Sequence, residues 1–388
     1  MKNEQSYLGQ CVSAYRKITE TGIGHPGAAD PLLEFSILRL AKVAINAGDS
    51  SLDWPAVYAR CRAEIAVVPE RAAGETVGLS WPIHPGAAWM AARGNGEYAK
   101  PFLDAAEKLV KEGHRNGDGL FDDPRYPGHL STEIAAMTIP ALAWAGVCAE
   151  DERFFSEAIR QFEGYKTVLY DPATRLWHPG YLPGRATAEM WRFQDKMPQS
   201  QELYLKHTGR YAGCWGRGEG YALFALSELV FELPDGHPKK AALLKLREDM
   251  LSGVLQYQDP NGMWHQVLDD WGSYAESSGS AWILYAMGRA LKRGTVDRSR
   301  FLIPCQKGLA GLSRYLIWDG GVFNVSQGCV CPGGRGTAAD YALLGWQRNP
   351  AQGFAPVVLA LQLAFQLELH DLIPSFSKVA ELFPGDEK

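Results

Sequence analysis

The sequence of 388 residues lacks any long hydrophobic run. A helix that spans a bilayer needs about 20 predominantly apolar residues, and no uninterrupted apolar stretch comes near that length. The N-terminal segment MKNEQSYLGQCVSAYRKI also lacks the apolar core of a secretory signal. A net charge of −5 offers no broad basic surface for nucleic acid or an anionic membrane. We therefore expect a cytoplasmic protein that binds neither.

Cysteine gives no framework either, because the seven cysteines are an odd set without regular spacing. Only Cys329 and Cys331 lie close together, where they could hold a metal, form a redox bond or remain two loop thiols. We favour the thiols, which suit a reducing compartment. No cluster of His, Cys and Asp has metal-ligand spacing, and no nucleophile signature is present. We therefore expect no metal and no cofactor.

Strand-like alternation is scarce and short, whereas helical periodicity runs through the whole chain. Apolar residues recur at i, i+3, i+4 and i+7 in roughly a dozen segments, the pattern of amphipathic helices. The segments are residues 7–21, 31–48, 55–67, 98–113, 131–146, 154–169, 220–233, 239–258, 280–294, 299–317, 337–347 and 353–369. The sequence therefore predicts an all-α protein.

Four short pieces between these segments resemble one another. GDGLFDDP, ATRLWHPGY, PNGMWHQVL and DGGVFNVSQ each combine a turn signal with Phe or Trp, and two continue with His. Such self-similarity indicates a repeat architecture. With no linker along the chain, we expect one domain over residues 1–388, built as a closed double ring of inner and outer helices. The loops of such a ring converge at one end, where aromatic and polar side chains suit a sugar.

The stretch GCWGRGEGYALFALSEL, residues 213–229, places Arg217 among glycines at the start of an apolar helix. It is not a phosphate loop, because it lacks the Lys-Ser/Thr pair and no strand precedes it. Two readings remain open. The glycines could simply serve a tight helix start, or Arg217 could bind a carboxylate through its planar fork beside Trp215 and Tyr221. We favour binding.

CWGRGEGY resembles the W-x-R-G-N-G-W motif of the unsaturated uronyl hydrolases, glycoside hydrolase families 88 and 105. NGMWHQVLDDWGSYAESSGSAW, LWHPGY and HLSTEIAAMTIPALAWAG resemble three further motifs of these families, and the similarity extends from Leu79 onward. The resemblance implies an (α/α)6 barrel. It also implies removal of a terminal 4,5-unsaturated uronic acid by hydration of the C4=C5 vinyl ether, with an aspartate as general acid and base.

The sequence departs from the family pattern at the acid. The family's catalytic aspartate falls on Glu133 and a second aspartate falls on Trp81, with His84 close by. The motif Asn becomes Glu219 and the motif Trp becomes Tyr221. The resemblance thus implies Glu133 and His178 as catalytic residues. Its implied substrate-binding residues are Trp81, His84, His129, Trp177, Trp215, Arg217, Glu219, Tyr221 and His265.

Each of these residues also has a purely structural interpretation. Glu133 could be a first-turn carboxylate behind a Ser131 or Thr132 cap, and His178 and His265 could be packed histidines. Glu276 is expected to bond backbone amides at a helix start. Two alternatives stay open for function: a glycosidase or lyase relative with Glu133 and Glu219 as a rearranged acid pair, and an inactive sugar-binding barrel. The expected partner is an oligosaccharide with a terminal unsaturated uronic acid, and a homodimer is left open.

Overall fold

The computed structural model describes residues 31–50, 52–66, 83–124, 126–182, 207–319, 322–330 and 338–369. The helix expected over residues 7–21 lies outside these ranges. Within them the protein is mainly helical, and each strand is two to four residues long. The long helices occupy the segments whose apolar residues follow the helical period, because only that spacing gives each helix an apolar stripe to bury.

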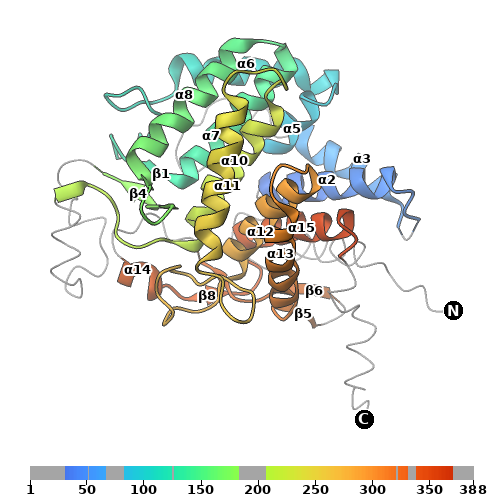
Figure 1. The fold of residues 1–388 in the computed structure, drawn as a ribbon. Helices are drawn as coiled ribbons and strands as arrows, with labels where there is room; N and C mark the ends of the chain where they lie inside the picture. Colours follow the sequence, from blue (N-terminus) through green and yellow to red (C-terminus); the bar gives the residue numbers. More distant parts are fainter. Residues whose placement is uncertain are drawn as a thin grey trace.

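Six of the described helices form a closed inner ring (Figure 1). They are α2 (Pro31–Asn46), α5 (Pro85–Ala91), α7 (Thr132–Ala149), α10 (Gly216–Glu232), α12 (Ser277–Lys292) and α15 (Ala351–Gln366). Each packs against the next in this order, and α15 packs against α2, which closes the ring. Helix α7 is long and apolar enough to cross a membrane, but 83% of it is buried inside the protein.

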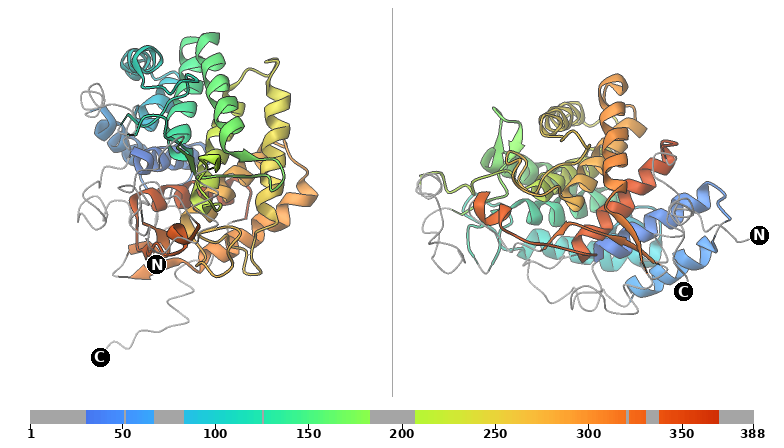
Figure 2. Two further views of the ribbon diagram at one scale, coloured as in Figure 1. Left: turned by 90° about the vertical axis from the view of Figure 1, so that its left-hand side faces the viewer. Right: turned by 90° about the horizontal axis from the view of Figure 1, so that it is seen from below.

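A second layer of helices surrounds this ring. It consists of α3 (Trp54–Ala66), α6 (Gly96–Glu112), α8 (Glu152–Leu169), α11 (Lys240–Leu255) and α13 (Arg298–Ser313). Each outer helix packs against the inner helix that precedes it in the chain. Figure 2 shows α11 in yellow and α13 in orange at the periphery in both views. The double ring expected from the repeated helix pairs is therefore present in the described residues.

The connections are unequal at the two ends of the ring. Short turns join each of α7, α10 and α12 to its outer partner, whereas long loops lead from the outer helices back to α7, α10, α12 and α15. Four antiparallel pairs of short strands lie in these long loops. They are β1 (Leu130–Ser131) with β4 (Gly180–Tyr181), β2 (Tyr170–Asp171) with β3 (Leu176–Trp177), β5 (Leu316–Asp319) with β6 (Val322–Val325), and β7 (Gly328–Cys329) with β8 (Trp346–Gln347).

Two expected helices are wrong in extent. The helix expected over residues 299–317 ends at Ser313, and strand β5 begins at Leu316. Residues 337–347 were predicted as a continuous helix, but the described helix α14 covers only Ala338–Ala342, and β8 follows it. Gly345 separates the two elements, and β8 gains its backbone hydrogen bonds from β7 instead. The expected role of Glu276 is confirmed. Its carboxylate caps α12 by accepting the backbone N–H groups of Ser278 (2.9 Å) and Gly279 (2.5 Å).

A buried ion cluster joins three inner helices across the ring. Glu228 on α10 accepts hydrogen bonds from Arg289 and Tyr285 of α12, and Arg39 of α2 approaches the same oxygen at 3.4 Å. Arg39 also donates to the Tyr285 hydroxyl over 2.6 Å. Burial alone would raise the pKa of Glu228, but the charges of Arg289 and Arg39 lower it to about 2. The carboxylate therefore stays ionised inside the protein.

Replacement of Glu228 by Gln should destabilise the fold strongly. The variant leaves Arg289 and Arg39 as buried charges without their counterion, and breaking a buried pair costs about 3–5 kcal/mol. Urea unfolding followed by circular dichroism measures this loss. Asp104→Asn is the matched control, because its pair with Lys100 is exposed and should contribute less than about 1 kcal/mol. Equal, small losses in both variants would contradict a structural role for the cluster.

Candidate active site

The candidate site lies at the end of the ring where the inner helices begin. The loops that lead into these helices are hydrogen-bonded to one another there: Thr132 N–H donates to the Pro179 carbonyl (3.2 Å) and Gly216 N–H to the Gln266 carbonyl (2.9 Å). Ser277 N–H donates to the Gln327 carbonyl over 3.0 Å. Figure 1 shows β1, β4, α14 and β8 along this side of the molecule. The loops thus meet as the repeat pattern predicted.

Glu133 occupies the first turn of α7 and is only 5% exposed. Ser131, two residues earlier, is the N-cap of α7, because its hydroxyl oxygen accepts a hydrogen bond from the Ile134 N–H. Capping therefore does not require the Glu133 carboxyl. The N-terminus of a helix favours a carboxylate over its neutral acid, since the peptide dipoles point their positive end there. Glu133 is thus a buried acid with a nearby field that stabilises its charged form.

Tyr211 stands at the centre of the residues around Glu133. Its ring stacks on His129, with the ring centres 5.6 Å apart and the planes 26° apart. Burial raises the pKa of the Tyr211 phenol, and the neighbouring Asp123, Tyr126 and Glu133 raise it further. The phenol is therefore neutral at every ordinary pH, and it can offer a proton to an acceptor without becoming charged.

His178 is fixed against the same tyrosine. Its Nδ1 lies 2.9 Å from the Tyr211 carbonyl oxygen, so Nδ1 carries the hydrogen and donates. Burial lowers the pKa of the imidazole, although this hydrogen bond opposes the shift. His178 is therefore neutral near pH 7, with an Nε2 lone pair as its acceptor. The structure thus brings together three of the residues implied by the sequence: Glu133, His129 and His178.

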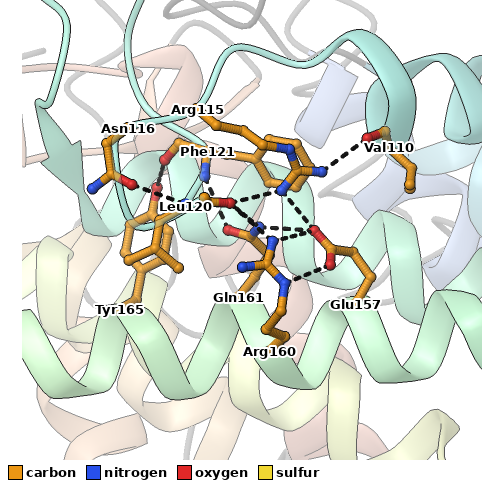
Figure 3. Close-up of polar contacts among 10 residues, drawn as sticks. Val110, Arg115, Asn116, Leu120, Phe121, Glu157, Arg160, Gln161 and Tyr165 are labelled. Carbon is orange, nitrogen blue, oxygen red and sulfur yellow. Dashed lines mark hydrogen bonds and ion pairs between the residues drawn. The ribbon is translucent and has the colours of Figure 1, made fainter.

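The loop that carries His129 is clamped onto α8 (Figure 3). Arg115, Arg160 and Gln161 all donate to the Gly119 carbonyl, at 2.8–3.1 Å. The same three side chains donate to Glu157. Burial would raise the pKa of Glu157, but hydrogen bonds from Arg160, Gln161 and Arg115 lower it to about 2. Glu157 therefore stays ionised, and these hydrogen bonds persist, except at strongly acidic pH.

A buried aspartate completes the support of this loop. Asp122 pairs with His114 and accepts the Gly128 N–H over 2.6 Å. The backbone between them folds back on itself, since His129 N–H donates to the Tyr126 carbonyl and Asp123 N–H to the His129 carbonyl. Together with the clamp on α8, these bonds fix the direction in which the chain enters α7 and thereby the place of Glu133.

The residues of the glycine-rich stretch lie deeper than expected. Trp215 is 2% exposed, stacks on Tyr341 with ring centres 5.3 Å apart, and meets Tyr221 edge to face. Arg217 is fully buried, lies over the Trp215 ring at 5.0 Å and donates to the Cys329 carbonyl at 3.0 Å. These side chains pack the protein interior in this structure, and a direct sugar contact by them stays a prediction.

Glu219 lies in the first turn of α10, the inner helix that packs beside α7. It is fully buried, and its Oε1 accepts the backbone N–H of Trp177. Within the described part of the chain its Oε2 has no hydrogen-bond partner. Burial raises the pKa of Glu219 well above its ordinary value, and the charge of Asp269 adds to this. Burial therefore favours the protonated form of Glu219, whose Oε1 holds the backbone of β3, and an acid pair with Glu133 stays a prediction.

The remaining candidates serve as structural supports in the described residues. His84 caps α5 through Nδ1, which accepts the Gly86 N–H, and its Nε2 lies 2.7 Å from Glu34. His265 donates to the Ser273 carbonyl (2.6 Å) and lies 3.4 Å from Asp259. Trp177 is buried between Phe162 and Tyr170. Trp81 and Cys331, and with it the Cys329–Cys331 pair, lie outside the described residues.

Sequence reasoning missed Tyr211, Asp123 and Tyr126. The only local sign was their position, because Asp123 and Tyr126 stand just before the Glu133 segment and Tyr211 just before Trp215. Their convergence comes from the ring, which no local pattern reveals. Among the described residues, no group of three or more His, Cys, Asp and Glu side chains is arranged to hold a metal ion. The site can therefore act through a buried acid, neutral donors and a neutral imidazole.

Comparison with known proteins shows a family match over most of the chain. The family model described as Glycosyl Hydrolase Family 88 matches residues 89–367. The unsaturated rhamnogalacturonyl hydrolase YesR of Bacillus subtilis is 27% identical over 248 residues, which cover 61% of this chain and 62% of the relative. The match thus spans less than two thirds of that protein's length.

Solved structures share the fold. A family 105 glycoside hydrolase of C. acetobutylicum has a TM-score of 0.72 at 20% identity, covering 93% of this chain and all of the other. The unsaturated glucuronyl hydrolase of Bacillus sp. GL1 has a TM-score of 0.64 at 15% identity, covering 94% and 98% of the two chains. The expected (α/α)6 barrel is therefore confirmed.

Glu219→Gln should stabilise the protein above pH 5. Because the pKa of Glu219 is raised in the folded state, the folded chain binds a proton that the unfolded chain loses above pH 4.5. Stability therefore falls as pH rises above that value, and Gln, which stays neutral, avoids the loss. Thermal unfolding at pH 5 and pH 8 should show a gap between variant and wild type that widens with pH. The exposed Glu112→Gln serves as control, and a pH-independent gap would refute the buried neutral acid.

Proposed function

The chain belongs to glycosyl hydrolase family 88, and from this premise we propose that it is a glycoside hydrolase that removes a terminal 4,5-unsaturated uronic acid from an oligosaccharide. One observation carries the proposal. Glu133, a buried carboxyl in the first turn of α7, lies near the Tyr211 phenol, and the neutral His178 is hydrogen-bonded to the backbone of the same tyrosine. The names of relatives support the same substrate class, since YesR is an unsaturated rhamnogalacturonyl hydrolase and a structural neighbour is an unsaturated glucuronyl hydrolase.

The proposed reaction adds water to a vinyl ether. The neutral Glu133 carboxyl gives its proton to C4, and positive charge develops at C5 next to the ring oxygen. Water then attacks C5 while the Glu133 carboxylate takes its proton, so the acid is restored. The resulting hemiketal opens to a ketone, and the aglycone leaves C1 with its own oxygen. The start of α7 stabilises the carboxylate that exists between the two proton transfers.

Neutral neighbours suit this chemistry. A neutral His178 can accept a hydrogen bond from the attacking water without repelling the positive charge at C5, and a neutral Tyr211 phenol can donate to an oxygen of substrate or acid. A charged imidazolium in the same place would oppose the charge that develops in the transition state. We therefore assign His178 the positioning of water and Glu133 both proton transfers.

Binding of the substrate carboxylate by Arg217 remains part of the proposal. A carboxylate is a stronger acceptor for the guanidinium fork than the carbonyls of Cys329 and Val330, which it meets in this structure at 3.0 and 3.4 Å. The acidic net charge of −5 makes such a local arginine necessary for an anionic substrate. The identity of the uronic acid, glucuronic or galacturonic, is left to experiment.

Glu133→Gln should abolish turnover of an unsaturated uronyl disaccharide while the fold and ligand binding persist. The amide keeps the shape and a hydrogen bond but has no proton to transfer, and such a loss is worth about 10²- to 10⁴-fold. Glu133→Asp should also be slower, because retracting the carboxyl by one methylene misplaces the acid. Loss of absorbance of the C4=C5 bond measures turnover, and circular dichroism checks folding.

The surface variant Glu112→Gln is the control and should match the wild type. Undiminished turnover by Glu133→Gln would remove Glu133 from the mechanism. Absence of wild-type activity on both unsaturated glucuronides and galacturonides would instead refute the proposed function as a whole and favour a barrel that only binds sugar.

A further inference from the structure

Trp271 is half exposed in a protein that buries most of its tryptophans. Its exposed fraction is 54%, and among the described tryptophans only Trp346, at 51%, is comparable. The others with a described side chain are buried: Trp54, Trp89, Trp144, Trp177, Trp215, Trp264 and Trp282. An indole left in water forgoes a large hydrophobic gain, so its placement at the mouth of a candidate site calls for a ligand.

The turn that presents Trp271 is tightly braced. Asp270 Oδ1 accepts the Gly272 N–H at 2.8 Å, and the Ser273 hydroxyl donates to the Asp270 carbonyl at 2.7 Å. The same hydroxyl oxygen accepts the Val267 N–H at 3.1 Å. An exposed side chain on a turn with these bonds has little freedom to collapse onto the protein surface. The indole is therefore held out on a fixed support, which lowers the entropy cost of binding a ligand.

The ring of His265 packs against the indole of Trp271. The rings of His265 and Trp271 meet edge to face, with centres 5.4 Å apart and planes 64° apart. His265 itself cannot turn away, because its Nδ1 donates to the Ser273 carbonyl at 2.6 Å and its Nε2 lies 3.4 Å from Asp259. The structural role of His265 is thus to set the orientation of the exposed tryptophan.

The Trp271 turn is continuous with the candidate active site. Its loop donates Leu268 N–H to the Cys214 carbonyl (2.8 Å), directly before the start of α10. The charge of Asp269 is close enough to act on His178, the proposed water-positioning residue. On the other side Tyr274 donates to the Gly345 carbonyl at 3.4 Å, which links the loop to β8 (Figure 1). The indole therefore stands at the rim of the same end of the ring.

The charges next to Trp271 select among sugars. Asp269 and Asp270 directly precede it in the chain, and neither forms an ion pair with a basic side chain of the described residues. Two uncompensated carboxylates repel a sulfated or uronic sugar at this place, whereas a neutral sugar can lay its apolar face on the indole. An acidic sugar is therefore disfavoured next to Trp271, and a neutral sugar is favoured there.

We propose that Trp271 is the stacking platform for a neutral sugar on the aglycone side of the cleaved residue, and that the protein therefore prefers unsaturated uronyl oligosaccharides with neutral over sulfated aglycones. This inference rests on the proposed function, since it names the substrate class of the same site. It adds a binding residue that was not among those implied by the resemblance to the family.

The test compares two substrates in one variant. One is a tetrasaccharide with an unsaturated glucuronyl residue followed by three neutral sugars, and the other is the methyl glycoside of unsaturated glucuronic acid. Trp271→Ala should lower kcat/KM for the tetrasaccharide about tenfold, mainly through KM, and leave the methyl glycoside unchanged. Trp271→Phe should restore part of the loss. Ile303→Ala, an exposed apolar residue on α13, is the control and should change neither substrate.

Equal losses on both substrates, or no loss on the tetrasaccharide, would overturn the platform. If the wild type turns over neither substrate, the proposed function fails, and the platform is judged by calorimetric binding of the neutral trisaccharide. Binding that weakens in Trp271→Ala but not in Ile303→Ala supports it even then. Absent binding, or equal affinity in both variants, overturns it.

The charge preference has a separate test. Asp270→Asn keeps the oxygen that accepts the Gly272 N–H and removes the negative charge. The ratio of kcat/KM for a neutral over a sulfated unsaturated disaccharide should fall severalfold in this variant. An unchanged ratio would overturn the selection against sulfated sugars while leaving the stacking platform to its own test.

Discussion

One carboxylate oxygen sets the geometry on which the rest of the structure depends. Glu228 Oε1 is shared by donors from Arg289 and Tyr285 on α12 and is approached by Arg39 on α2, so three inner helices meet at one buried charge. A charge in the interior is costly unless it is paired and hydrogen-bonded, and here the pairing fixes which helix faces turn inward. The cluster stabilises the end of the ring near the C-terminus of α10. The candidate active site lies at the opposite end, where the long loops lead into the inner helices.

Three buried glutamates show how position decides chemistry. Glu228 stays ionised because arginines surround it, whereas burial and the charge of Asp269 raise the pKa of Glu219 well above its ordinary value. Glu133 lies at a helix start near the neutral phenol of Tyr211, the setting in which we propose that it acts as acid and carboxylate in turn. Glutamate thus forms a stabilising ion cluster at Glu228, supports a strand at Glu219 and is the proposed catalyst at Glu133.

The ring and its functional end could be predicted from the sequence because both rest on local patterns. Helical periodicity marks the inner and outer helices, and the cap at Glu276 follows from its place before a helix. The burial of individual side chains inside the ring could not be predicted from local patterns. Trp215 and Arg217 read as a binding platform, yet they pack against Tyr341 and Cys329, residues more than a hundred positions away in the chain. Apart from its position before Trp215, Tyr211 had no local signal, because its importance comes from its closeness to the Glu133 segment of the neighbouring helix α7.

The central claim is that water adds across the C4=C5 bond and that the glycosidic bond breaks only as a consequence. Turnover of an unsaturated uronyl disaccharide in heavy water, followed by nuclear magnetic resonance of the released acid, tests it most directly. Protonation of carbon predicts one deuterium on C4 and loss of the double bond in step with aglycone release. Release of an intact unsaturated sugar acid, without deuterium on C4, would contradict the account.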